Sequence, residues 1–214
     1  MYDAVRDGKA DVAYCEHARD KEQLSTAPTA PVYHDCVFEN FVTKRLNIKI
    51  YIHNKIFRRD LIKDIFFPEN IAIGEDAVYI YRIMYRTEKI AHVPERLYYY
   101  RERSGSAVNS SLSEKIIMSN FMAAELLFKE FNDKAMSRLS RKYLNRRTAY
   151  RFFKFAVTEP IHSENGVHKK EWYVYTWPLL KKYKDAGIYK PQHLTLNNRI
   201  RSWLFLNFTG RQKR

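Results

Sequence analysis

The sequence predicts an α/β region over residues 1–110 and a basic α-helical region over residues 111–214. Short apolar runs separated by turn residues fill the first region, which is typical of alternating strands and helices. From residue 111 onwards, apolar residues recur at helical spacing. The charge changes as well, because residues 132–214 hold 19 of the 38 Lys and Arg residues but only 5 of the 24 Asp and Glu residues, and so carry the whole net charge of +14.

The composition excludes several classes of protein. Hydrophobic residues make up 45% of the chain and aromatic residues 15%, with 6 Gly and 7 Pro, so the chain is folded rather than disordered or collagen-like. Its first residues lack the pattern of a signal peptide, and no apolar run approaches the ~18 residues of a membrane span. Cys15 and Cys36 are the only cysteines and form no zinc-binding pattern, which favours a reducing, cytoplasmic compartment.

The first region is expected to contain short elements. The expected segments are a helix over 2–6, a strand over 11–14, a loop over 19–31, and strands over 71–73, 90–93 and 97–100. Pro94 separates the last two strands. Apolar residues at helical spacing from Ala77 to Met84 predict a helix that follows Gly74.

The second region is expected to be helical throughout. Ser111 and Glu114 have the S-x-x-E spacing of a capping box, which places the start of the first helix there. Apolar residues recur up to Phe131, and those from Met136 to Val157 indicate a second helix. Further helices are expected over about 169–184 and 195–208.

Two segments are candidates for chemistry. Glu75 and Asp76 lie at a predicted strand-to-helix junction, from which a carboxylate can point into a cleft at the strand ends. Acidic residues in a first helical turn also complement the helix dipole without any further role. The segment over 98–106 contains Arg101 and Arg103, whose guanidinium groups suit a diphosphate. A basic loop after a strand is also commonly just solvated, so both interpretations stay open on spacing alone.

Together these segments resemble the acceptor half of bacterial family 2 glycosyltransferases. The resemblance rests on the runs Asn54-Lys55-Ile56-Phe57-Arg58-Arg59-Asp60-Leu61, Phe67-Pro68-Glu69-Asn70, Gly74-Glu75-Asp76 and Tyr98-Tyr99-Tyr100-Arg101-Glu102-Arg103 with Ser106. It extends over residues 1 to about 110 and is looser beyond. The family implies a GT-A fold, here an incomplete half with a mixed sheet. It also implies transfer of a sugar, with inversion, from a nucleotide diphosphate to a surface-glycan or lipid-linked acceptor in capsule, exopolysaccharide or other cell-surface polysaccharide biosynthesis.

The resemblance also implies roles for individual residues. Asp76 would be the catalytic base, with Glu75 beside it, since a carboxylate can take the proton of an acceptor hydroxyl as that hydroxyl attacks the anomeric carbon. Arg101 and Arg103 would offset the charge of the leaving diphosphate. The substrate-binding residues implied by the matched runs are Asn54, Lys55, Arg101, Arg103 and Ser106.

The sequence departs from the family at two places. His53 stands where the family commonly has Trp. In addition, no D-x-D occurs and the family's N-terminal nucleotide-binding strands and helices have no counterpart, so the chain resembles a member that begins just after its metal ligands. The family implies Mn²⁺ or Mg²⁺ as a cofactor, held by carboxylates together with substrate phosphates. The matching ligands are absent from this sequence, and we expect the chain to be inactive on its own.

The charge of the second region points to a polyanionic partner, which leaves a non-enzymatic class open. A nucleic acid fits the basic charge, but the neutral first region matches no nucleic-acid motif, so no nucleic acid is expected. An anionic membrane surface fits the segment over 195–214, a basic amphipathic helix, and implies peripheral attachment at the inner face of the cell membrane. A terminal helix packed on its own domain is the alternative for the same segment.

We expect the chain on its own to show no detectable binding of UDP in the presence of Mn²⁺. The reason is that the D-x-D carboxylates of the family have no counterpart in it. Isothermal titration calorimetry measures this directly, and micromolar binding would contradict the expectation.

Overall fold

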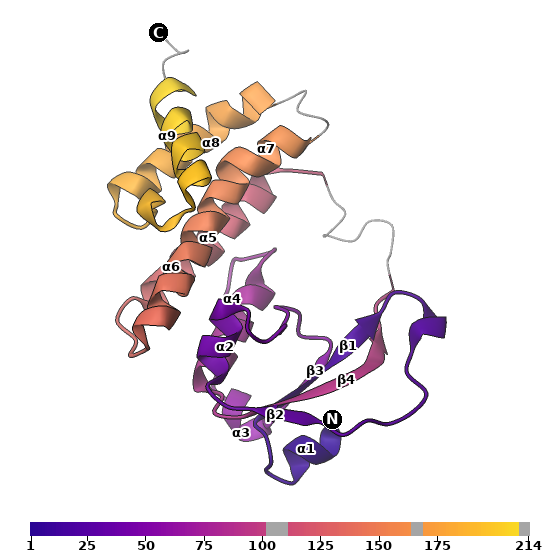
Figure 1. Cartoon of the computed structure of the whole chain (residues 1–214). Coiled ribbons are helices and arrows are strands. Elements are labelled where there is room, and N and C mark those ends of the chain that lie inside the picture. The colour runs from indigo at the N-terminus through magenta and orange to yellow at the C-terminus, as the bar shows by residue number, and fades with distance from the viewer. Residues whose placement is uncertain (102–110, 164–168, 210–214) are drawn as a thin grey trace. The chain divides into compact units, whose positions relative to one another are not determined.

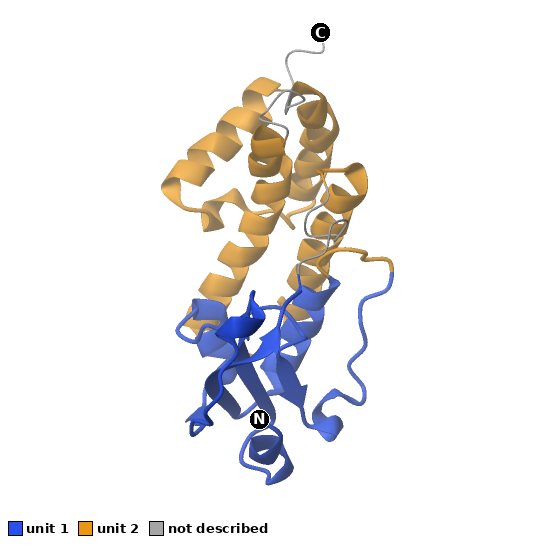
Figure 2. Cartoon of the chain, turned by 90° about the vertical axis from the view of Figure 1, so that its right-hand side faces the viewer, with its two compact units in different colours: residues 1–69, 75–109 blue, residues 70–74, 110–214 orange. Residues whose placement is uncertain are grey.

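The structure is a computed structural model that divides the chain into two compact units (Figure 2). It describes residues 1–101, 111–163 and 169–209. Unit 1 contains residues 1–69 and 75–109, and unit 2 contains residues 70–74 and 110–214. Apart from residues 70–74, an α/β unit is therefore followed along the chain by a helical unit, which confirms the predicted fold class.

Within the described residues, unit 1 is built on an open four-stranded sheet in the order β2-β4-β1-β3 (Figure 1). The strands are β1 (Val12–Ala18), β2 (Val32–His34), β3 (Lys55–Phe57) and β4 (Ile90–Tyr99). β1 and β4 run parallel, whereas β2 and β3 pair antiparallel at the two edges. The sheet is therefore mixed, as expected, and each of its edge strands is only 3 residues long.

Helices accompany the sheet of unit 1. They are α1 (Tyr2–Arg6), α2 (Val37–Thr43), α3 (Arg59–Ile62) and α4 (Glu75–Arg86), with a 3-10 turn η1 (Lys21–Gln23). α1 packs through Ala4 against Ala13 and Ala91 of the two central strands. α2 packs against α4, where the rings of Phe41 and Tyr81 lie 4.8 Å apart. The helices predicted over 2–6 and after Gly74 are confirmed.

Pro94 does not end a strand, because β4 continues through it from Ile90 to Tyr99. The two separate strands expected here are therefore wrong. Cys15 pairs with Val93 and the next residue of β1 pairs with Arg96, so two residues of β4 bulge out of the ladder at the proline. A bulge accommodates a residue that has no N–H to donate.

The strand expected over 71–73 is also wrong, because residue 71 has no regular structure and residues 72–74 form a bend. Asn70 and Gly74 have φ angles of 63° and 96°, in the left-handed region that interrupts an extended chain. The sequence patterns also missed β2, α2 and β3, which are 3, 7 and 3 residues long. Elements of this length give little periodic signal.

Within the described residues, the regular elements of unit 2 are all helical. Its elements are α5 (Glu114–Phe131), α6 (Arg138–Phe153), a π-helical turn η3 (Lys154–Thr158), α7 (Glu159–His162), α8 (Lys169–Asp185), η5 (Pro191–His193) and α9 (Leu196–Phe208). α5 packs on α6, where Phe121 and Phe152 meet edge to face at 5.1 Å, and Tyr183 of α8 contacts both rings. The predicted helices are confirmed. Among the described helices, none has both the length and the apolar character needed to cross a bilayer.

The first helix of unit 2 is capped by Ser113 rather than Ser111. The Ser113 side-chain oxygen accepts the backbone N–H of Ile116 at 3.3 Å, and Glu114 is the first helical residue. Glu114 therefore cannot reach back as the third residue of a capping box, and that expectation is wrong.

Replacing the N-cap residue tests this assignment. We expect Ser113→Ala to lower the free energy of unfolding by about 1 kcal/mol, because the Ile116 N–H loses its acceptor. The exposed Ser111→Ala is the matched control and is expected to change it by less than about 0.5 kcal/mol. Urea unfolding followed by circular dichroism measures both, and equal effects would contradict the assignment.

Candidate functional site

The candidate site lies at the carboxyl edge of the parallel pair β1 and β4. Parallel strands bring their carboxyl ends to the same edge of a sheet, where α/β proteins commonly bind ligands. β3 runs antiparallel to β1 and pairs Lys55 with Tyr14, so the start of β3 meets this same edge. Residues from three separate stretches of unit 1 therefore converge here.

Asn54 and Lys55 are anchored to the backbone of their neighbours. Only 4% of Asn54 and 9% of Lys55 are exposed. The Asn54 side-chain amide donates to the carbonyl oxygen of Cys15 at 2.6 Å. Lys55 Nζ donates to the carbonyl oxygen of Tyr51 at 2.5 Å and to Asn54 Oδ1 at 2.8 Å. These contacts hold the edge together, and the substrate-binding role of the two residues stays a prediction.

Asp76 lies half-buried in the first turn of α4, with Glu75 beside it. Burial raises the pKa of Asp76, the neighbouring Glu75 raises it further, and Lys55 opposes the shift. Burial also lowers the pKa of Lys55 to about 7, against the attraction of Cys15, Asp76 and Glu16. Asp76 and Lys55 are therefore close enough to influence each other's protonation. A carboxylate with a raised pKa accepts a proton more readily than an ordinary one.

An aromatic cluster lies at the same edge, with His53 at its centre. The His53 ring lies 4.5 Å from that of Tyr98 and 5.2 Å from those of Tyr51 and Tyr100. His17 of β1 meets His53 edge to face at 6.4 Å. We call these five residues the aromatic cluster. The position at which the family commonly has Trp thus carries another ring with several aromatic neighbours.

His53 has an unusual electrostatic environment. Burial lowers its pKa, and Lys55 and His17 lower it further, so the ring is neutral at pH 7. Within the part of the chain that the structure describes, the buried His53 Nε2 has no hydrogen-bond partner. Lys55 thus acts on both His53 and Asp76, which links the aromatic cluster to the carboxylate.

The predicted phosphate-binding residues are only partly described. Arg101 is exposed directly after β4, beyond the Tyr100 N–H that bonds to the carbonyl oxygen of Ala18 at 2.8 Å. Arg103 and Ser106 lie outside the described residues.

The described residues contain no set of side chains that could bind the expected Mn²⁺ or Mg²⁺. Among residues 1–101, 111–163 and 169–209, no group of three or more His, Cys, Asp or Glu side chains could hold an ion. The Mn²⁺ or Mg²⁺ that the family implies therefore does not fit these residues.

Several neighbours of the site were missed from sequence. His17 and Tyr51 complete the aromatic cluster. Glu16 Oε1 lies 3.0 Å from His92 Nε2, and the His92 ring stacks on Tyr14 at 4.5 Å. These pairings depend on the register between β1 and β4, for which the sequence carries no short-range signal.

Comparison with known proteins identifies the fold. The chain matches no protein-family model and no curated protein. Its structure is similar to that of S. aureus TarS residues 1–349 in complex with UDP-GlcNAc, with a TM-score of 0.55 and 16% identity, covering 88% of this chain and 52% of that one. It is also similar to a structure of S. aureus TarS, with a TM-score of 0.51 and 14% identity, covering 98% and 36%. The chain thus spans about half of the first and about a third of the second. Its fold is glycosyltransferase-like.

The buried lysine gives the site a signature in the pH dependence of stability. The pKa of Lys55 is about 7 in the folded chain and has its ordinary value of 10.5 when unfolded. Between these values the unfolded chain binds more protons, so the free energy of unfolding rises with pH. We expect a rise of about 1–2 kcal/mol from about pH 7 to pH 8.5 that is absent in Lys55→Met.

Urea unfolding across this range measures the effect, with the exposed Lys49→Met as the control that keeps the rise. The range stops near pH 8.5 because burial raises the pKa of the Cys15 thiol, whose ionisation in the unfolded chain works in the opposite direction at higher pH. A Lys55→Met variant with the full rise would show that another group causes it.

Proposed function

We propose that the chain supplies the acceptor side of an inverting glycosyl transfer from a nucleotide diphosphate sugar. The observation that carries the proposal is the half-buried Asp76 at the edge of the β1–β4 pair, electrostatically linked through Lys55 to the aromatic cluster. The glycosyltransferase-like fold supports it, as does the crystallisation of the neighbour TarS with UDP-GlcNAc.

In this proposal Asp76 is the general base. An acceptor hydroxyl is a weak nucleophile until its proton is removed. Asp76 takes that proton as the hydroxyl oxygen forms a bond to the anomeric carbon, and the bond from that carbon to the diphosphate oxygen breaks. One displacement inverts the anomeric carbon. The raised pKa of Asp76 favours proton transfer to it.

The aromatic cluster is proposed to hold the acceptor. Aromatic faces pack against the apolar faces of sugar rings, and the Tyr51 ring of the cluster is 41% exposed, so an acceptor can reach it. Within the proposal, the acceptor is a surface glycan or a lipid-linked sugar of cell-surface polysaccharide biosynthesis. The resemblance in the sequence supports that choice.

On the donor side, the proposal assigns Arg101 to the leaving diphosphate. Arg101 follows β4 at the carboxyl edge, where its charge can offset that of a leaving diphosphate. Arg103 and Ser106 share this role by resemblance. A divalent cation stays an expectation from the resemblance alone, because the described residues offer no ligand set for it.

Asp76→Asn tests the base. We expect transfer to fall by about 10²–10⁴-fold, because the amide cannot accept the proton, while donor binding stays unchanged. The assay uses a form of the protein that also carries a D-x-D nucleotide-binding segment. The matched control is Asp60→Asn, an exposed carboxylate in the first turn of α3. Wild-type turnover by Asp76→Asn would assign the base to another residue.

The acceptor role is tested on the chain itself by saturation-transfer NMR with a panel of sugars and alditol phosphates. Tyr98→Ala is expected to weaken binding about tenfold, whereas Asp76→Asn leaves it unchanged. Failure of every compound to bind would contradict the acceptor role.

A further inference from the structure

α9 has apolar side chains on two opposite sides. One side packs into unit 2 through Phe205, which is 4% exposed, and through Ser202, which is fully buried. The other side faces solvent with large apolar side chains that are each 46–71% exposed. These residues, the outer face of α9, are Leu196, Ile200, Trp203, Leu204 and Phe208. The helix is therefore packed on its own unit, as the second alternative expects, and also exposes an apolar stripe. Attachment of this segment to a membrane surface stays a prediction.

Contacts on the inner side fix the rotation of the helix. Tyr189 and Ser202 share a hydrogen bond of 2.7 Å between their hydroxyl oxygens, in a buried position. The Trp177 indole N–H donates to the carbonyl oxygen of Leu206 at 3.1 Å. The ring of Phe205 meets that of Tyr173 at 4.9 Å. Because these contacts hold the inner side, the outer face cannot turn inward without breaking them.

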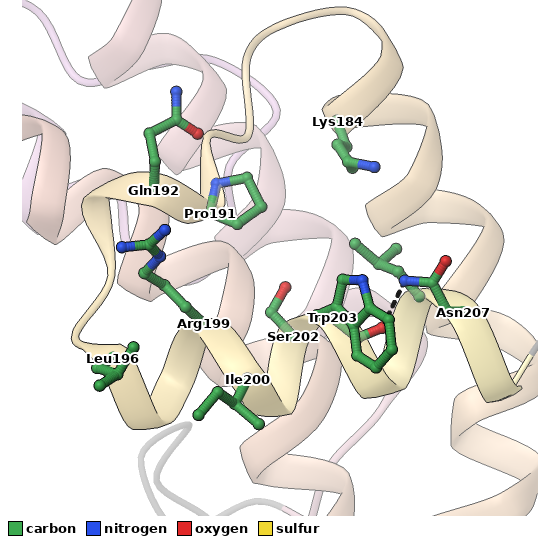
Figure 3. Close-up of a pocket in the computed structure, with 10 residues that line it drawn as sticks. Lys184, Pro191, Gln192, Leu196, Arg199, Ile200, Ser202, Trp203 and Asn207 are labelled. Atoms are coloured by element: carbon green, nitrogen blue, oxygen red, sulfur yellow. Dashed lines mark hydrogen bonds between the residues drawn. The ribbon is translucent and has the colours of Figure 1, made fainter.

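A groove of about 450 Å³ lies beside the outer face, lined by three of its residues, Leu196, Ile200 and Trp203, and by Ser202 of the inner side (Figure 3). α9 forms one wall with Ile200 and Trp203, and the end of α8 and η5 form the other with Lys184 and Pro191. Lys184 and Arg199 line this groove, so it combines an apolar lining with two cations. Contiguous apolar surface of this kind on a soluble unit commonly marks an interaction site.

Both charged side chains that line the groove, those of Lys184 and Arg199, are cations. Along the sequence, residues 186–214 contain six Lys or Arg residues and no Asp or Glu. A second copy of the chain at this face would place cations against cations, which opposes association. A nucleic acid would neutralise the charge but leave aliphatic side chains such as Leu196 and Ile200 in water. An anionic lipid surface satisfies both properties, because it takes up apolar side chains and attracts cations.

We propose that the outer face of α9 docks on an anionic lipid surface, with its apolar side chains among the acyl chains and with Lys184 and Arg199 at the headgroup phosphates. This attachment is independent of the proposed transfer reaction.

Co-sedimentation of the full chain with phosphatidylglycerol–phosphatidylcholine vesicles tests the proposal. The chain is expected to bind these vesicles, to be released by salt, and not to bind pure phosphatidylcholine. The double substitution Ile200→Ser and Leu204→Ser is expected to weaken binding about tenfold or more. Lys184→Gln and Arg199→Gln are each expected to weaken it about fivefold.

The matched control for the apolar substitutions is Val174→Ser on α8, which removes a side chain that is 50% exposed outside the outer face. It is expected to bind as the unaltered chain does, and circular dichroism confirms that each variant is folded. Equal binding to neutral vesicles, or full binding by the Ile200→Ser and Leu204→Ser variant, would overturn the proposal. So would a chain that ignores vesicles but self-associates or retains oligonucleotides through this face.

Discussion

The parallel pairing of β1 with β4 is the interaction on which the rest of unit 1 depends. Its register sets His17 beside Tyr98 at the carboxyl edge, which brings two parts of the aromatic cluster together. β3 then attaches to the other side of β1, where Asn54 and Cys15 exchange hydrogen bonds through their backbone and the Asn54 side chain. Lys55, His53 and Tyr51 are near neighbours in sequence, and the pairing of β1 with both β3 and β4 brings them to His17, Tyr98 and Tyr100.

One carboxylate fixes where the ladder begins. Asp11 is 7% exposed and accepts the backbone N–H groups of Glu88 at 2.8 Å and Lys89 at 3.2 Å. It also pairs with Arg58 at 2.8 Å, directly after β3. A buried charge is tolerated only where hydrogen bonds and a counter-charge compensate for lost water, and Asp11 has both. The turn that joins α4 to β4 is thereby tied to the start of β1.

The sequence predicted the elements whose formation depends on residues within the same segment. α4 and the helices of unit 2 follow from apolar periodicity over several turns. Pro94 was expected to end a strand, but a bulge accommodates it within β4. Ser113 was missed as the N-cap because Ser111, two residues earlier, is an equally suitable residue type. The candidate base followed from a family resemblance. The contacts of His53 with His17 and Tyr98 did not, since these residues lie on β1 and near the end of β4, and only cross-strand register brings them together.

The same pairing has a consequence for the rate of folding. Val12 pairs with Ile90, so the long intervening chain must be closed into a loop, at an entropic cost, before the ladder forms. In unit 2 many contacts join helices that follow one another, such as α5 and α6. Non-local parallel pairing slows folding relative to local helix contacts, so the sheet is expected to close last on refolding. During that delay a chain is most exposed to misassembly. The brevity of β2 and β3 limits the hazard once the sheet has closed, because short edges offer few unpaired backbone groups to another chain.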